Sequence, residues 1–269
     1  MRAIPVRSKE KSRMDVSKGS AIITGGASGL GEACARRLAA AGARPVIVDM
    51  NEEAGKKVAA ELNGEFVKCD VSSEEQFAVA VETAAGLAPL RVLVNGAGIG
   101  SAGRTVDRKG EPFKQSVFET VIRVNLLGTF NCLRLAAAMM AKTEPLDDQG
   151  QRGAIVNMAS VAAFDGQIGQ CAYSASKGGV VGMTLPIARD LAAIGIRVNT
   201  IAPGLFDTPI YGQGEGSEAF KAKLGQSVLF PKRLGYADEL ASMVMELLTN
   251  DYMNGEVVRA DGGVRLPPK

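Results

Sequence analysis

The chain has 269 residues, of which 31 are Lys or Arg and 29 are Asp or Glu, giving a formal charge of +2, and it contains no histidine. The lack of imidazole excludes Ser-His-Asp and Cys-His catalytic groups, HExxH zinc sites and histidine proton shuttles. Because the charge is nearly balanced along the chain, we expect neither nucleic acid nor an anionic membrane as a partner. An apolar content of 46% is enough for a substantial core.

The four cysteines lie far apart and form no CxxC pair, which argues against a zinc ribbon or a dithiol redox motif. We therefore expect no metal site, and buried free thiols in a reducing compartment. They are Cys34, Cys69, Cys132 and Cys171. No stretch approaches the roughly 20 apolar residues of a membrane span, so we expect no membrane insertion.

Residues 1–18 are basic, but they contain acidic residues and no apolar run, so they do not form a secretory signal. The sequence predicts a flexible leader over 1–18 and a cytoplasmic protein. A mitochondrial presequence, which would direct the chain to the matrix, is the alternative.

After this leader, short β-branched runs alternate with Ala-rich stretches. Strands are predicted at 20–24, 44–49, 64–69, 91–95, 153–160, 196–203 and 255–262. Helices are predicted at 29–41, 51–62, 73–86, 116–141, 171–193 and 237–248. Short apolar strands separated by amphipathic helices are typical of a parallel sheet with right-handed crossovers. No linker interrupts the series, so residues 19–269 are predicted to form one α/β domain.

Two segments are longer than the connections that a repeat of strand and helix requires. Residues 142–152 are polar and predict a surface loop. Residues 205–235 are rich in glycine and follow a strand end, where ligands bind in an open α/β sheet. We interpret 205–235 as a mobile lid, with an inert surface excursion as the alternative.

A glycine-rich turn, GGASGLG, follows the first predicted strand and leads into a helix. Gly25, Gly29 and Gly31 allow a tight turn, close approach of the backbone to a pyrophosphate, and close packing of helix on strand. The helix N-terminus offers free N–H groups to the phosphates. Asp49, at the end of the second strand, can bind the adenosine ribose hydroxyls and would repel a 2′-phosphate, which favours NAD over NADP. A helix N-cap or a surface acid is the alternative for Asp49.

The next two strand ends add candidates on the same edge of the sheet. Asp70 and Val71 could flank an adenine ring, although Asp70 could equally cap the helix that begins near Ser73. The segment VNGAGIG, residues 94–100, places Asn95 and three glycines at the end of the fourth strand. A tight strand-to-loop turn is the alternative there.

Tyr173 and Lys177, in AYSASKGG, lie four residues apart on a predicted helix and therefore share one face. An ammonium beside a phenol stabilises the phenolate, which lowers the tyrosine pKa towards working pH. Tyr173 could then serve as a general base without histidine. For the pair taken alone, a solvated helix face is the alternative.

In order and spacing, TGGASGLG, VNGAG, Asn125, Ser160, YSASK and APG at 202–204 resemble the short-chain dehydrogenases/reductases over residues 19–266. The resemblance implies a Rossmann-like, doubly wound sheet of seven parallel strands. It also implies that Asn125, Ser160, Tyr173 and Lys177 form a catalytic tetrad. In that tetrad Tyr173 takes the hydroxyl proton and Lys177 holds the nicotinamide ribose. Ser160 orients the substrate oxygen and Asn125 holds a water.

The glycine-rich turn, the strand ends and the family resemblance together predict which residues bind the cofactor and the substrate. The cofactor residues are Thr24, Gly25, Ser28, Gly29, Leu30, Gly31, Asp49, Asp70, Val71, Asn95, Gly96, Ala97, Gly98, Tyr173, Lys177, Pro203, Gly204, Leu205 and Thr208. The substrate residues are Ser160, Gln167 and Tyr173.

Residues 150–209 and NGEVVRADGGVR near the C-terminus resemble the branch of this family that oxidises 3-hydroxyacyl-CoA. That branch implies an NAD-dependent homotetramer of fatty-acid metabolism. A dehydrogenase of another secondary alcohol, such as a hydroxysteroid or a xenobiotic, is the first alternative. A non-catalytic dinucleotide-binding scaffold is the second, and the intact tetrad argues against it.

Four cations on the lid could meet the phosphates of CoA, although a solvated helix face explains any one of them. They are Lys221, Lys223, Lys232 and Arg233.

Overall fold

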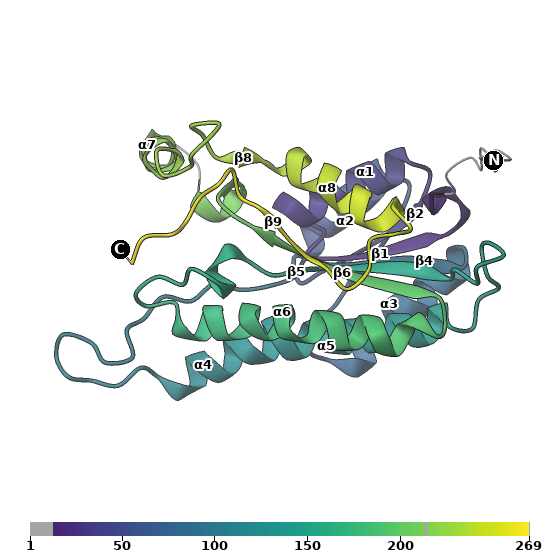
Figure 1. Ribbon diagram of the computed structural model, residues 1–269, viewed down its shortest axis with the longest axis horizontal. Coiled ribbons are helices and arrows are strands. Elements are labelled where there is room, and N and C mark those ends of the chain that lie inside the picture. The colour runs from purple at the N-terminus through teal and green to yellow at the C-terminus, as the bar shows by residue number, and fades with distance from the viewer. Residues whose placement is uncertain (1–12, 213–214, 269) are drawn as a thin grey trace, which may run out of the picture.

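The computed structural model describes residues 13–212 and 215–268 and shows a parallel sheet between two layers of helices (Figure 1). The sheet has seven strands in the order β3-β2-β1-β4-β5-β6-β9, and every neighbouring pair is parallel. The strands are β1 Ser20–Thr24, β2 Arg44–Asp49, β3 Glu65–Lys68, β4 Leu90–Asn95, β5 Gly153–Met158, β6 Ile196–Pro203 and β9 Val257–Ala260. The predicted doubly wound α/β fold is confirmed.

The helices divide between the two faces of the sheet (Figure 1). One face carries α1 Gly29–Ala40, α2 Glu52–Glu61 and α8 Ala237–Thr249. The other carries α3 Glu74–Leu87, α4 Gln115–Ile122, α5 Gly128–Met140 and α6 Cys171–Ala192. Because side chains alternate along a strand, Ile22 packs in one hydrophobic cluster and Ile23 in the other.

The run from Gln115 to Met140 contains α4, a π-helical turn at Arg123–Leu127, and α5. By length and composition alone this run could cross a membrane, but half of its most apolar window is buried inside the fold. It packs against α3 and α6, as a core helix does.

The segment 205–235 contains structure that its composition did not predict. β7 Phe206–Asp207 pairs in parallel with β8 Gly235–Tyr236, so a small second sheet joins the start of the segment to its end. Between them lie a 3-10 turn at Pro209–Tyr211 and the helix α7 Glu215–Gly225. In Figure 1, α7 stands apart from the main helix layers.

The end of the predicted leader is packed on the domain. Met14 and Val16 are each 4% exposed, and the Met14 N–H donates to the carbonyl of Thr249 at 3.1 Å. Arg13 forms an ion pair with Glu246 at 2.9 Å. Residues 13–18 therefore belong to the folded domain, which corrects the boundary predicted at 19, because two apolar side chains in a basic segment find the core beside α8. Residues 1–12 of the predicted leader lie outside the described residues.

The cysteines are free thiols, three of them buried. Burial raises the pKa of Cys34 and of Cys69 to about 12. Cys171 is exposed at the start of α6, contrary to the expected burial.

Candidate active site

The carboxyl ends of the central strands open into a cavity of about 890 Å³. This edge includes the point between β1 and β4 where the strand order reverses, which is where open α/β sheets bind ligands. All but three of the predicted site residues line the cavity. Those that do are Gly25, Ser28, Gly29, Leu30, Gly31, Asp49, Asp70, Val71, Gly96, Ala97, Gly98, Ser160, Gln167, Tyr173, Lys177, Pro203, Gly204, Leu205 and Thr208.

The turn after β1 leaves no room for side chains. Gly25 and Gly29 have φ of +65° and +56°, in the left-handed region that favours glycine. A Cβ on Gly31 would lie 2.1 Å from the carbonyl oxygen of Gly25, so only glycine lets α1 pack this closely on the turn. The bare backbone and the N-terminus of α1 form a cradle that fits a pyrophosphate.

Asp49 lies beside this turn. One carboxylate oxygen accepts from the Ala27 N–H at 3.1 Å and the other from the Asn51 N–H at 2.9 Å. The N-cap of α2 is Asn51, whose side chain accepts from the Ala54 N–H, so the N-cap alternative for Asp49 is wrong. The Asp49 carboxylate faces the cavity, where it can accept from ribose hydroxyls and repel a 2′-phosphate.

Asp70 stands further along the same edge of the cavity. Its carboxylate accepts from the Ser72 N–H at 2.9 Å and pairs with Arg123 at 3.1 Å. Burial raises the pKa of Asp70, but the bonds from Ser72 and Arg123 outweigh it and hold this pKa below its ordinary value. The N-cap of α3 is Ser73, so Asp70 does not cap this helix.

Thr24 and Asn95 are buried behind the turns and do not line the cavity. The Thr24 hydroxyl accepts from the N–H groups of Gly96 and Ala97, both at 3.1 Å. Asn95 points towards α5 and donates to the side chain of Asn157 at 2.9 Å. Thr24 therefore supports the turn after β4, and Asn95 ties the end of β4 to β5 and α5. Both side chains point to the protein interior, so their predicted contact with the cofactor stays a prediction.

Tyr173 and Lys177 share one face of α6, as their spacing predicted, and both line the cavity. The Lys177 ammonium lies 5.8 Å from the centre of the Tyr173 ring and donates to the carbonyl oxygen of Met158 at 2.8 Å. Burial lowers the pKa of Lys177 to about 8. Lys177 therefore exchanges its proton close to neutral pH.

The pKa of Tyr173 is shifted upwards, whereas the sequence predicted that it would be lowered. Burial raises it above its ordinary value, while a hydrogen bond with the Ser160 side chain works in the opposite direction. The Lys177 ammonium is directed at Met158 and not at the phenol oxygen. The Ser160 oxygen already accepts from the Ala162 N–H at 3.1 Å, which leaves the hydroxyl proton free to donate.

Asn125 lies in the π-helical turn between α4 and α5 and is fully buried, so it does not line the cavity. Its side chain accepts from the Ile99 N–H at 2.8 Å, and its amide donates to the Ile99 carbonyl at 2.9 Å and to the Ser176 hydroxyl at 3.1 Å. A Cβ on Gly98 would lie 3.2 Å from the Asn125 oxygen and 3.4 Å from the Lys177 nitrogen. Asn125 thus ties the loop after β4 to α6 directly behind Lys177. Single-turn π-helices are frequent at functional sites.

The sequence did not identify the residues that form the apolar wall of the cavity. Tyr211, Phe220, Leu224 and Leu266 contribute to it. The ring of Phe220 packs edge-on against that of Tyr211, with centroids 6.1 Å apart. The four-residue spacing of Phe220 and Leu224 is a helical signal that could have identified α7 as part of the site.

The lid cations are largely occupied by other groups. Lys221 pairs with Asp207 at 2.9 Å, and Arg233 pairs with Glu239 at 2.8 Å. Lys232 donates to the carbonyl of Gln226 at 3.3 Å. These contacts favour the solvated-surface interpretation over the predicted contact with phosphates.

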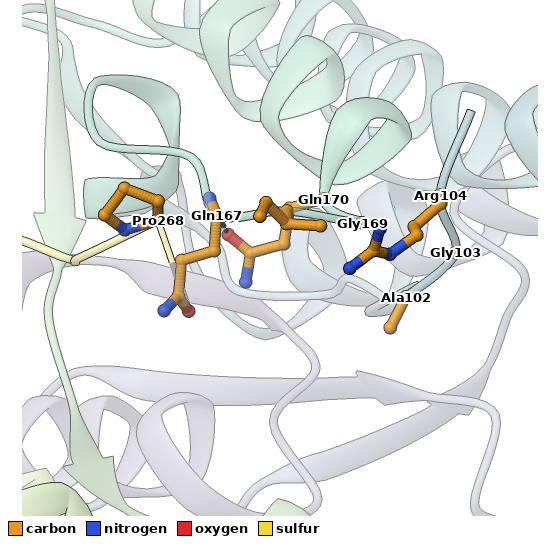
Figure 2. A pocket seen from close by; sticks show the side chains of 8 residues that line it. Ala102, Gly103, Arg104, Gln167, Gly169, Gln170 and Pro268 are labelled. Carbon is orange, nitrogen blue, oxygen red and sulfur yellow. Dashed lines mark hydrogen bonds between the residues drawn. The ribbon is translucent and has the colours of Figure 1, made fainter. Parts of the chain in front are cut away.

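A smaller cavity of about 480 Å³ shares Gln167 and Gln170 with the large one (Figure 2). Its other lining comes from Ala102–Arg104, Ile168, Gly169 and Pro268. The Arg104 side chain stands across the cavity from the two glutamines in Figure 2.

A family profile described as short chain dehydrogenase matches residues 20–217, and the chain belongs to this family. The chain is 50% identical over 252 residues to human 3-hydroxyacyl-CoA dehydrogenase type-2, covering 92% of this chain and 95% of the relative. It is 49% identical over 251 residues to the protein of the same name from Drosophila melanogaster, covering 92% of this chain and 97% of the relative. The crystal structure of 3-hydroxyacyl-CoA dehydrogenase type-2 from Mycobacterium avium matches with a TM-score of 0.90 at 48% identity, over 95% of this chain and 99% of that chain.

Proposed function

We propose that this protein is an NAD-dependent dehydrogenase that oxidises the 3-hydroxyl group of a 3-hydroxyacyl-CoA to the ketone. The observation that carries the proposal is the convergence of Ser160, Tyr173 and Lys177 in one cavity, between a glycine cradle and an apolar wall. The relatives named above supply the substrate class.

The residues of the chain account for binding, orientation and proton transfer. When bound, NAD would supply the hydride acceptor. Ser160 would donate to the substrate oxygen and hold it near Tyr173, whose phenolate would take the hydroxyl proton. Lys177, with its pKa of about 8, would hold the nicotinamide ribose and exchange protons next to Tyr173. Asn125 would position the loop after β4 against this group and hold the predicted water beside it.

The cofactor would lie along the carboxyl edge of the sheet. Gly25, Gly29 and Gly31 would accommodate the pyrophosphate, and Asp49 would accept from the adenosine ribose. Asp70 and Val71 would flank the adenine, while Pro203 and Thr208 would lie near the nicotinamide. These residues all line the cavity, which supports NAD as the cofactor.

The direct test is the formation of NADH with a panel of 3-hydroxyacyl-CoA thioesters of rising length, a branched analogue and a hydroxysteroid. We expect turnover of at least one thioester, and higher kcat/KM with NAD than with NADP. Turnover of the hydroxysteroid alone would replace the proposal with a dehydrogenase of another secondary alcohol, for which the aromatic lining by Phe206, Tyr211 and Phe220 provides an apolar pocket. Binding of NADH with no turnover on the panel would favour the non-catalytic scaffold.

We further propose a homotetramer, in line with the family resemblance. Large apolar side chains are exposed on the helical face: Leu127 is 55% exposed, Phe130 47% and Leu185 46%. Light scattering is expected to give four times the 28.0 kDa of one chain, and a mass of one chain would refute the assembly.

We also propose a cytoplasmic location, which the free thiols support, with the mitochondrial matrix as the alternative. Fractionation of cells that produce the full chain separates the two, because import would place the protein in the matrix fraction.

A further inference from the structure

A short segment, Asp261–Pro268, leaves β9 and crosses the open side of the substrate region; we call it the strap. In Figure 1 it is the last part of the yellow trace, which runs from β9 past α7 to the C label. Near the start of the strap, Gly262 and Gly263 have φ values of +57° and +80°, which favour glycine and turn the chain. The side chain of Leu266 lines the large cavity, and Pro268 lines the smaller one.

The strap is bonded to both sides of the cavity. On the lid side, the Gly262 carbonyl accepts from the N–H groups of Leu229 and Phe230 at 3.1 and 3.2 Å. On the side that leads into α6, the Pro268 carbonyl accepts from the Ile168 N–H at 3.0 Å. The strap therefore connects the end of the lid to the loop that precedes the catalytic helix.

Gln167 lines both cavities and bonds directly to the strap. Its side-chain amide donates to the Pro267 carbonyl at 3.1 Å, and its backbone N–H donates to the side-chain oxygen of Gln170 at 3.0 Å. In Figure 2 the two glutamine side chains lie next to each other between Pro268 and Arg104. The position of Gln167 thus depends on the strap at one end and on α6 at the other.

Arg259, on β9, fastens the strap to the loop before α6. Its guanidinium donates to Asp261 at 2.8 Å, to Asp165 at 2.6 Å and to the Val264 carbonyl at 3.1 Å. It also stacks 5.2 Å from the ring centre of Phe164. The arginine and Asp165 side chains are each only 22% exposed, so this branched pair is better shielded from solvent than an ordinary surface pair.

The strap adds an apolar residue to the lining of the large cavity. Leu266 lines this cavity together with Phe220 and Leu224, whereas Arg104 lines only the smaller cavity. An acyl tail is apolar, so it fits the part of the large cavity that these three apolar residues line.

We infer that the strap forms the wall that limits acyl-chain length, with Leu266 as the specificity-determining residue and Arg259 as the positioning residue that holds the wall in place. The inference rests on the proposed function. It adds to the lid a second determinant of substrate choice, which is built from the chain beyond β9.

The first experiment is Leu266→Ala, assayed with 3-hydroxyacyl-CoA thioesters of four to ten carbons. Removing the side chain opens apolar space, so kcat/KM for the longer chains should rise relative to the shortest by about fourfold for each additional buried methylene. Val79→Ala, a truncation on the exposed face of α3, is the matched control and should leave the chain-length profile unchanged. An unchanged profile in a Leu266→Ala protein whose Tm matches the parent would overturn the assignment of Leu266.

The second experiment is Arg259→Gln. With the strap unfastened, KM for the thioester should rise at least about fivefold, while kcat and the Kd of NADH change far less. Arg37→Gln removes an exposed arginine–aspartate pair between α1 and α8 and is the matched control. Arg259→Lys keeps the charge without the branched geometry and should restore KM only in part.

Amide hydrogen exchange supplies a readout that needs no substrate. The Ile168 amide donates to the strap. Its exchange rate should be at least about tenfold higher in Arg259→Gln than in the parent, and the same as in the parent in Arg37→Gln. Equal protection of the Ile168 amide in the parent, Arg259→Gln and Arg37→Gln would refute the positioning role of Arg259. If the unmodified protein turns over no thioester, the proposed function fails by itself, and the chain-length comparison is then made with secondary alcohols of rising length.

Discussion

The cavity has two halves that are built in different ways. The cofactor half consists of the turns at the ends of β1 to β4, where glycines and Asp49 are placed by a buried parallel sheet. The substrate half consists of the lid, the loop before α6 and the strap, which are held by contacts between segments distant in sequence. Tyr173 and Lys177 of α6, which are the proposed catalytic residues, line the same cavity as both halves.

The difference shows where binding and selectivity can change independently. In the cofactor half, backbone atoms approach so closely that a single Cβ is excluded at Gly31. In the substrate half, the Phe220 side chain remains 49% exposed. We therefore expect substitutions at the glycines of the first half to alter folding and cofactor binding together, and substitutions in the second half to alter the kinetics with the substrate while the Kd of NADH stays the same.

The largest effect is expected for Gly31→Ala. The added Cβ would overlap the Gly25 carbonyl, so we expect a loss of about 3 kcal/mol in the free energy of unfolding and a Kd for NADH raised at least about a hundredfold. Urea unfolding and NADH fluorescence measure the two quantities. Gly86→Ala, in α3 with open space around it, is the control and should stabilise the protein by about 0.5–1 kcal/mol. Normal NADH binding by Gly31→Ala would show that the close packing at Gly31 is not required for cofactor binding.

Lys177→Met tests how much the buried Lys177 ammonium lowers the free energy of unfolding. The folded pKa of about 8 lies below the unfolded value of about 10.4, so the unfolded chain binds the proton more tightly and the free energy of unfolding rises with pH between these values. Below pH 8 we expect Lys177→Met to be more stable than the parent by about 1–3 kcal/mol, and the gap to narrow as the pH rises towards 10. Urea unfolding at pH 7 and 9.5 tests this, and a gap independent of pH would contradict the buried charge.

Asp49→Ser separates cofactor choice from cofactor binding. Removing the carboxylate abolishes its repulsion of a 2′-phosphate, so the ratio of kcat/KM with NADP to that with NAD should rise by about tenfold or more. Glu53→Ser, on the exposed surface of α2, is the control for loss of a negative charge nearby. A preference that is the same in parent and Asp49→Ser would show that another group selects the cofactor.

The smallest effect is expected in the substrate half. Phe220→Ala removes an apolar contact from a side chain that is half exposed, so KM for the thioester should rise by about threefold to tenfold. The Kd of NADH should stay at the parent value. A matching loss of NADH affinity would mean that the two halves are coupled.

Much of the fold could be predicted because its determinants are local. The buried strand runs and helix caps such as Asn51 and Ser73 mark element ends to within a few residues. The helix α7 was missed although the four-residue spacing of Phe220 and Leu224 is a helical signal, because the segment is rich in glycine. The pairing of β7 with β8 was missed because it depends on contacts across the segment. Residues 13–18 were missed for the same reason.

In the site, too, features set by the local sequence could be predicted, and features set by contacts between distant segments could not. The glycine turn and the pair Tyr173 and Lys177 carry chemical patterns that the sequence displays, and they line one cavity. The directions of Thr24 and Asn95 could not be read from residue type, since a polar side chain at a strand end serves a ligand or a neighbouring loop equally well. The raised pKa of Tyr173 depends on its burial, which spacing on a helix does not reveal.

In the proposed reaction Tyr173 takes the hydroxyl proton of a 3-hydroxyacyl-CoA, and bound NAD would supply the hydride acceptor. Its most direct test is single-turnover formation of NADH from a four-carbon thioester by the parent and by Tyr173→Phe, with the Kd of NADH measured for both. We predict NADH formation by the parent, a rate about 10² to 10⁴ lower for Tyr173→Phe, and equal affinity for NADH. Equal rates of NADH formation in the two proteins would contradict the proposed role of Tyr173 in proton transfer.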